Sequence, residues 1–265
     1  MNKDELKLNI ENMPMFSLQP VNMEKDNSNI AQPQFKAVCE EGENNAIAVV
    51  SDRYNLVQFK SVFLPVVNGI KGDLQGKLFS FNGTAVMDIF PTDAQYMNNN
   101  YQYGITVKNS VDRTSSLVIR FSVMKNGFRI TLPRTLQGFK KSHSQSNLLH
   151  FAQMYSGVLT RVQKEWEMIV TGFSERQIDN EQELLDICTD KAFGFSDKMR
   201  KKLVMIFRTY KAQNLPYTLW AFFEDSIALV SSVNHKSEVH KRNHTDALVE
   251  KILQYGFLTK FMKTL

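Results

Sequence analysis

Arginine and lysine side chains gather in one part of this sequence without an acidic neighbour. Between Asp112 and Glu165 there is no acidic residue at all. The basic residues of this stretch are Arg113, Arg120, Lys125, Arg129, Arg134, Lys140, Lys141, Arg161 and Lys164. Guanidinium and ammonium groups bind phosphate oxygens, so the chemistry to expect is the binding of an anion. All 27 acidic residues lie outside the stretch, so the net charge of +5 originates within it.

Three histidines form a second candidate site, in the segment NHKSEVHKRNHTD. His235, His240 and His244 lie close together, and the last two are four residues apart. On a helix that spacing puts both rings on one face, as in metal-binding helices. The basic residues between them favour a solvated linker instead. A metal-dependent enzyme built on these histidines is therefore a third hypothesis, after nucleic-acid binding and protein binding.

Enzyme signatures are missing from the sequence. It has no phosphate-binding glycine-rich loop, dinucleotide fingerprint, nucleophile elbow or zincin helix. The main carboxylates near the predicted strands are Asp88 and Asp93, fewer than two-metal nuclease chemistry requires. We therefore expect a non-enzymatic protein without a cofactor.

The basic residues are positioned by a predicted β-hairpin. Asn126-Gly127 is the dipeptide that two-residue hairpin turns favour, because both positions need positive φ. This turn pairs Lys125 with Phe128 and Met124 with Arg129. Since side chains alternate along strands, one face carries the apolar residues and the other the polar ones. The apolar set is Phe121, Val123, Ile130 and Leu132, and the polar set is Arg120, Ser122, Arg129 and Thr131.

This pattern predicts a basic sheet face that holds a nucleic-acid backbone. Loops on either side add Arg113, Arg134, Lys140 and Lys141. Phe139 and Tyr96 could stack on unpaired bases, whereas Phe128 is predicted on the core side. No recognition helix or zinc finger is evident, which favours single strands over duplex. A solvated basic face with no partner is the alternative that the charge pattern leaves open.

The remaining elements predict an α+β fold, with an antiparallel β-meander backed by a long helix and followed by a helical C-terminal region. Apolar residues recur at spacings of three and four from Leu148 to Ile169, which is typical of a helix, with Arg161 and Lys164 on its exposed side. A shorter helix is expected at 58–68. We expect a flexible N-terminal arm at 1–34, a core domain with the basic face at 35–170 and a helical region at 171–265.

Composition indicates a soluble, cytoplasmic protein. Hydrophobic residues make up 43% of the chain, and no apolar run approaches the roughly 20 residues of a membrane span. The N-terminus lacks the apolar core of a signal peptide. Cys39 and Cys188 match no metal or redox spacing, so buried free thiols in a reducing compartment are expected.

Several short segments, in order, resemble the phage/plasmid-like proteins, a family of unknown function on mobile elements. They are SDRYNLVQ, SVDRTSSLVIRFSVMKNG, SHSQSN and YTLWAFFEDSIALVSSVNH, and the resemblance spans about 35–245. The chain departs from the family pattern at three places. Val123 or Met124 stands where the family often has Cys, and Glu224 and Ile227 stand where it has Asn and Thr.

The predicted order of elements is also similar to the core of single-strand annealing recombinases, the Erf and Red-beta relatives. That resemblance implies a homo-oligomer that holds single-stranded DNA in a basic groove during recombination or replication. The alternative is a phage-encoded protein or inhibitor that docks its basic patch on an acidic host protein. Fold likeness does not decide function, so both hypotheses stand.

Overall fold

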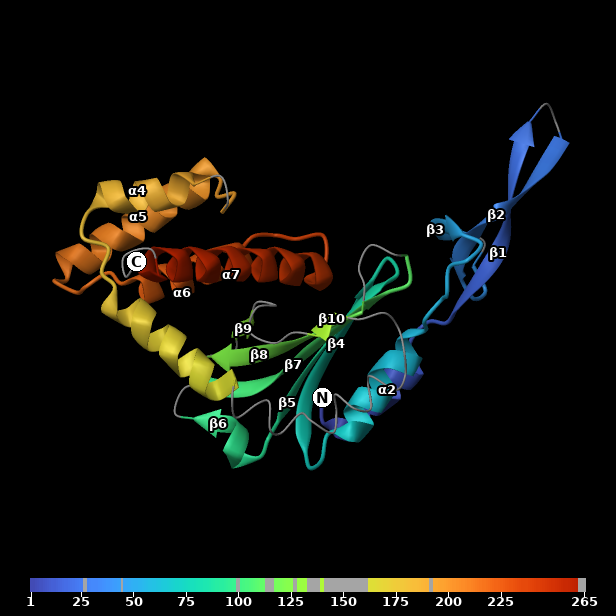
Figure 1. Cartoon of the computed structure of the whole chain (residues 1–265), viewed down its shortest axis with the longest axis horizontal. Helices are drawn as coiled ribbons and strands as arrows, with labels where there is room; N and C mark the ends of the chain where they lie inside the picture. Colours follow the sequence, from blue (N-terminus) through green and yellow to red (C-terminus); the bar gives the residue numbers. More distant parts are fainter. Residues whose placement is uncertain are drawn as a thin grey trace.

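The computed structural model describes residues 1–25, 28–43, 45–98, 101–112, 117–125, 128–132, 139–140, 162–190 and 193–261. These residues form an α+β fold with two antiparallel sheets and helices (Figure 1). The fold class is therefore the one that the sequence predicted.

The larger sheet has seven strands and occupies the centre of the molecule (Figure 1). Its main strand order is β10-β8-β7-β5-β4, with β9 paired to β8 and β6 paired to β7. The strands are β4 (Leu74–Phe81), β5 (Thr84–Pro91), β6 (Met97–Asn98), β7 (Tyr101–Ser110), β8 (Val118–Lys125), β9 (Phe128–Thr131) and β10 (Phe139–Lys140). A short 3-10 helix, η1 (Ala94–Tyr96), precedes β6.

Two predicted hairpins are confirmed by strand register. Lys125 pairs with Phe128 and Met124 with Arg129, as a two-residue loop requires. The turn between β4 and β5 contains Asn82 at φ 45° and Gly83 at φ 69°. Two-residue hairpin turns with positive φ at both positions favour the dipeptide Asn-Gly. The division of β8 and β9 into an apolar and a polar face follows directly from this register.

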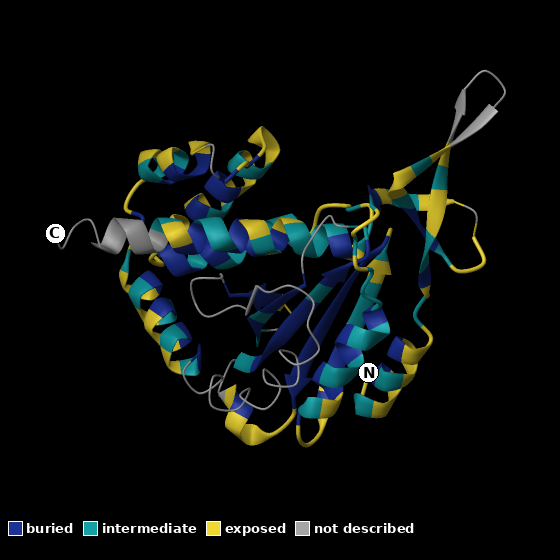
Figure 2. Cartoon of the chain, turned by 45° about the vertical axis from the view of Figure 1, so that its right-hand side comes forward, coloured by how far each residue is buried: buried dark blue, intermediate teal, exposed yellow. Residues whose placement is uncertain are grey.

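Helices cover both faces of the sheet. On one side lie α1 (Lys3–Glu11), which contacts β4, and α2 (Phe59–Gly69), which contacts β5 and β7. On the other side, α7 (Glu238–Phe261) crosses the polar face and contacts β4, β5 and β9 (Figure 1). Figure 2 shows the strands as a buried layer between these helices. The polar face is therefore an interior surface.

The expectation of a flexible arm at 1–34 is wrong for most of that segment. Asn2 and Glu5 form a capping box at the start of α1, and Leu6 and Ile10 of this helix are fully buried. Two strands follow, β1 (Phe16–Lys25) and β2 (Ser28–Glu40), and β3 (Ala46–Ser51) completes a three-stranded sheet in the order β1-β2-β3. The outer part of the β1–β2 hairpin projects away from the body (Figure 1).

The C-terminal helices correspond only in part to the predicted ones. Residues 162–175 are helical, while the earlier part of the predicted long helix lies outside the described residues. Three further helices are α4 (Glu181–Thr189), α5 (Asp197–Ala212) and α6 (Leu219–Ser231). The side chain of Asn180 caps α4, and Gln177, just before this helix, forms a β-bridge with Thr218.

One hydrophobic core runs through all three predicted segments. It contains Leu6 from the expected arm, Phe121 from the sheet and Leu253 from α7. The predicted division into an arm, a core domain and a separate helical region is therefore not reflected in the packing. Cys39 and Cys188 are both buried and free, as expected. Within the described residues, no helix has the length and apolar character needed to cross a membrane.

Candidate nucleic-acid interface

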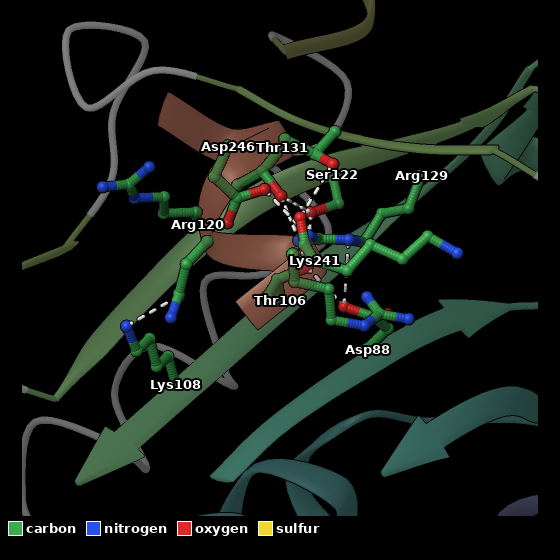
Figure 3. Close-up of polar contacts among 12 residues, drawn as sticks. Asp88, Thr106, Lys108, Arg120, Ser122, Arg129, Thr131, Lys241 and Asp246 are labelled. Atoms are coloured by element: carbon green, nitrogen blue, oxygen red, sulfur yellow. Dashed lines mark hydrogen bonds and ion pairs between the residues drawn. The ribbon is translucent and has the colours of Figure 1, made fainter. Parts of the chain in front are cut away.

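A layer of hydrogen-bonded polar side chains lies on the face of the sheet beneath α7 (Figure 3). Thr106 Oγ1 donates to Asp88 Oδ1 at 2.7 Å and lies 2.6 Å from Ser122 Oγ. Arg129 Nη1 donates to Thr106 Oγ1 at 3.1 Å and to Thr131. All five side chains are buried. Adjacent strands position them because period-2 alternation sends these residues to the same face.

Helix α7 closes this layer with groups of both charges. Asp246 Oδ1 accepts from Arg129 Nη2 at 2.8 Å, and Arg242 Nη1 donates to Asp88. Arg129 Nε lies 3.7 Å from Asp88 Oδ1. The Arg242 guanidinium also stacks over the Phe79 ring, 4.2 Å from its centre. These two arginines and two carboxylates, with their hydroxyl partners, are called the arginine network below.

Burial and charge pairing act against each other in the arginine network. Burial by itself lowers the pKa of Arg129, but the Asp246 and Asp88 carboxylates outweigh it, so the pKa is raised. At Arg242 burial prevails and the pKa is lowered, although Asp88 opposes the change. Both arginines, and Arg120, have a buried Nε without a hydrogen-bond partner among the described residues. Removing one partner from such a buried pair is costly, which ties α7 to the sheet.

The predicted exposure of the sheet cations is wrong. The Arg129 side chain is only 5% exposed and is held by Asp88 and Asp246. Arg120 is 13% exposed and lies 3.7 Å from Glu250 of α7. A sheet face with alternating polar residues usually meets solvent, but here a helix more than a hundred residues later supplies matching carboxylates. In this conformation these arginines are not free to hold a nucleic-acid backbone.

Lys125 is engaged in a similar way, by α6. Its Nζ donates to Glu224 and lies 5.4 Å from the Trp220 ring centre and 5.5 Å from that of Tyr101. Burial lowers the pKa of Lys125, but Glu224 outweighs it and the pKa is raised. The amine is therefore charged and already paired.

Of the other predicted contacts, only Lys164 has a described side chain, and it is exposed on the helix at 162–175. Lys140 belongs to β10, where only its backbone is described. The predicted contacts outside the described residues are Arg113, Arg134, Lys141 and Arg161. Their role stays a prediction.

A cavity of about 430 Å³ opens beside the arginine network, between β4, β9 and α7. We call it the cationic pocket. The residues that line it are Lys77, Phe79, Met124, Phe128, Arg129, Ser231, Glu238, Lys241, Arg242 and Thr245. Four of these side chains are cationic and one, Glu238, is acidic. The pocket is suited to an anion.

Two of the four cations remain available to a ligand. Lys77 is exposed and has no ion pair within the described part of the chain. Lys241 lies 3.5 Å from Glu238, but both side chains are partly exposed, so this pair is weak. In Figure 3 the Lys241 side chain points away from the buried network. Beside them the Phe128 ring is 47% exposed, which corrects the prediction that it belongs to the core.

A second cavity of about 230 Å³ adjoins the first and is called the adjoining pocket. Its lining residues are Lys125, Phe128, Ile130, Glu224, Asp225, Ile227 and Ala228. Phe128 therefore contributes to both pockets. A third cavity, of about 260 Å³, lies between β7, β8 and residues 243–250 of α7. Lys108 Nζ, in its lining, donates to Asn243 Oδ1 at 2.9 Å.

Sequence reasoning missed the cationic pocket because its residues come from three distant segments. The sequence favours a solvated linker for the segment that contains Lys241 and Arg242. In the structure this segment forms the first turns of α7. Lys77 occupies an exposed position of β4 and carries no local signal. No apolar residue lies between Val239 and Ala247, so the first turns of α7 carry no helical period in the sequence.

The three histidines do not converge on one site. The His240 ring packs against Phe81, with centres 5.2 Å apart, and its Nδ1 lies 2.8 Å from Ser237 Oγ. His235 and His244 face each other instead, with ring centres 5.3 Å apart. Within the described residues, no group of three histidine, cysteine or acidic side chains could hold a metal ion. His240 and His244 do lie four residues apart on a helix, but their rings contact different neighbours.

Comparisons with protein-family models, curated proteins and solved structures found no match to this chain.

Proposed function

We propose that this chain is a non-enzymatic protein that binds single-stranded nucleic acid, with DNA favoured, in the cytoplasm of a cell that carries a phage or plasmid. It would act in recombination or replication, and annealing of single strands by an oligomer is the form of that activity we favour. The observation that carries the proposal is the cationic pocket, in which Lys77 and Lys241 lie beside the exposed Phe128 ring.

These side chains match what a single strand presents. Lysine amines bind phosphate oxygens as point charges, and the two exposed lysines give up little ion pairing to do so. An aromatic ring at the rim stacks on an unpaired base, an interaction worth about 1–3 kcal/mol per base. In duplex DNA the bases are already stacked and paired, so the ring favours single strands.

The test is binding of a labelled oligonucleotide, single-stranded and duplex, across a salt series. Lys77→Ala combined with Lys241→Ala should weaken single-strand binding at least tenfold at low salt. Each single-strand phosphate contact contributes about 0.7 to the log–log salt slope, so losing two should reduce the slope by about 1.4. Fluorescence anisotropy measures both quantities.

The matched control is Lys198→Ala combined with Lys201→Ala, which removes the same charge from the exposed side of α5. Binding should fall much less in this control. An equal loss in both double variants would mean that only net charge matters. If the unaltered protein binds no oligonucleotide at low salt, the proposal fails and an acidic protein surface becomes the better ligand for the same cations.

A further inference from the structure

Phe128 lines two pockets of different chemical character. The cationic pocket has four cationic lining residues and one acidic one, whereas the adjoining pocket has two carboxylates and one cation, Lys125. Phe128 begins β9 directly before Arg129, so the hairpin between β8 and β9 fixes the place of the ring. A ligand that contacts the ring can therefore extend into both cavities at once.

The adjoining pocket combines apolar side chains with carboxylates. Ile130 of β9 and Ile227 and Ala228 of α6 supply the apolar part. Glu224 and Asp225, from the preceding turn of α6, supply the carboxylates. The volume of about 230 Å³ lies below the roughly 300–1,000 Å³ of pockets that hold drug-sized ligands. It suits one small ring system with polar hydrogens on its edge.

Glu224 is the acceptor that a ligand can reach. Its side chain is 37% exposed, and one oxygen, Oε1, accepts from Lys125. An ionised carboxylate has about four lone-pair sites, so it can accept further hydrogen bonds after that one. The Oδ2 atom of Asp225 is buried, so this carboxyl is less accessible to a ligand. The pocket thus offers carboxylate acceptors, and the cation in its lining, Lys125, already donates to Glu224.

We propose that the adjoining pocket is a base-binding subsite that selects guanine in single-stranded nucleic acid. The proposal rests on the proposed function, because it takes the cationic pocket as the site of the neighbouring phosphate. The base would stack on Phe128 and lie against Ile130 and Ile227, with its polar edge toward Glu224.

Guanine is selected because of the order of groups along its edge. Its ring N–H and its amino group are adjacent donors, and a carboxylate presents two acceptors side by side. The amino groups of adenine and cytosine adjoin a ring nitrogen that is an acceptor, and the imino N–H of thymine lies between two carbonyl oxygens. Those acceptors would face the carboxylate and repel it. Only guanine makes two hydrogen bonds with Glu224 without such a conflict.

The experiment compares short thymidine oligonucleotides that carry one central guanine, inosine, adenine or thymine. The base of inosine is guanine without the amino group. Comparing the affinities of the guanine and inosine oligonucleotides therefore isolates one hydrogen bond. We expect guanine to bind at least about tenfold more tightly than inosine, since inosine lacks one hydrogen bond to a charged group. Adenine and thymine should bind no better than inosine.

Glu224→Gln should abolish the preference for guanine over inosine, because a carboxamide presents one acceptor and one donor in place of two acceptors. Glu250→Gln is the matched control. It removes another carboxylate that pairs with a sheet cation, Arg120, but lies outside the adjoining pocket. The guanine preference should survive in this control.

The two proposals fail differently. Equal binding of guanine and inosine by the unaltered protein, with measurable affinity for both, overturns the guanine subsite and leaves single-strand binding intact. A guanine preference that persists undiminished in Glu224→Gln also overturns the subsite. Absence of binding to every oligonucleotide overturns both proposals.

Discussion

At the scale of single residues, Asp225 shows how position decides charge. The carboxyl lies in the adjoining pocket, next to Glu224 and close to Tyr217. Burial raises the pKa of Asp225, the neighbouring Glu224 charge raises it further, and the Tyr217 hydroxyl offsets part of this. Ionisation of Asp225 therefore costs more in the folded chain than in the unfolded chain.

The contribution of Asp225 to the free energy of unfolding therefore decreases as pH rises above the ordinary pKa of an aspartate, near 4. The unfolded chain loses its Asp225 proton first, and the loss of stability ends once the folded chain has lost the proton as well. Asp225→Asn removes this titration. Its free energy of unfolding, compared with that of the unaltered protein, should therefore rise between pH 4 and pH 7, within the about 0.5–3 kcal/mol usual for single substitutions.

Urea unfolding at several pH values measures this difference. Asp186→Asn on α4 is the matched control, because it makes the same substitution at an exposed aspartate. A difference for Asp225→Asn that is flat or shrinks with rising pH would contradict the assignment.

At the scale of elements, α7 is what converts a polar sheet face into an interior. The β8–β9 register could be predicted because Asn126-Gly127 is a local signal, and α5 could be predicted from its period and from the Ser196 cap. The covering of the polar face by α7 could not be predicted from the sequence. Arg129 and Asp246 are 117 residues apart in the chain, and no local pattern connects them. An alternating strand looks the same whether solvent or a charged helix covers it.

The attachment of α7 can be tested by breaking the arginine network at its centre. Arg129→Ala leaves the buried Asp88 and the partly buried Asp246 with a partner missing, so it should lower the free energy of unfolding by about 3–5 kcal/mol. Arg208→Ala is the matched control, because it breaks an arginine–carboxylate pair with Glu181 that is largely exposed. Solvent screens such a pair, so Arg208→Ala should lower the free energy of unfolding much less than Arg129→Ala.

Denaturant unfolding of both variants gives the comparison. Equal, small losses would mean that solvent reaches Arg129 and that α7 does not seal the sheet face. An Arg129→Ala variant that keeps its stability and loses single-strand binding would restore the sheet arginines as backbone contacts.

At the scale of the whole molecule, the N-terminal segment belongs to the same packed unit as the C-terminal helices. Low hydrophobicity at 1–34 suggested an arm, but two apolar residues one turn apart are enough to dock a capped helix. Leu6 and Ile10 enter the core that also holds Trp166 and Trp220. Two apolar residues one turn apart are too short a pattern to predict a packed helix from sequence. The sheet surface that the helix covers must also be known.

Leu6 and Leu8 of α1 provide a test of this unity. Leu6 is fully buried and its side chain lies over Gly76 of β4, whereas Leu8 is 59% exposed. Leu6→Ala should cost about 2–5 kcal/mol, and Leu8→Ala no more than about 0.5 kcal/mol. Unfolding followed by tryptophan fluorescence reports on Trp166 and Trp220, far from α1 in sequence, and circular dichroism reports on the whole chain. In a single cooperative unit the two transitions coincide, and Leu6→Ala moves both equally. A tryptophan transition that stays in place when Leu6 is shortened would show that the N-terminal segment unfolds on its own, as a separate arm would.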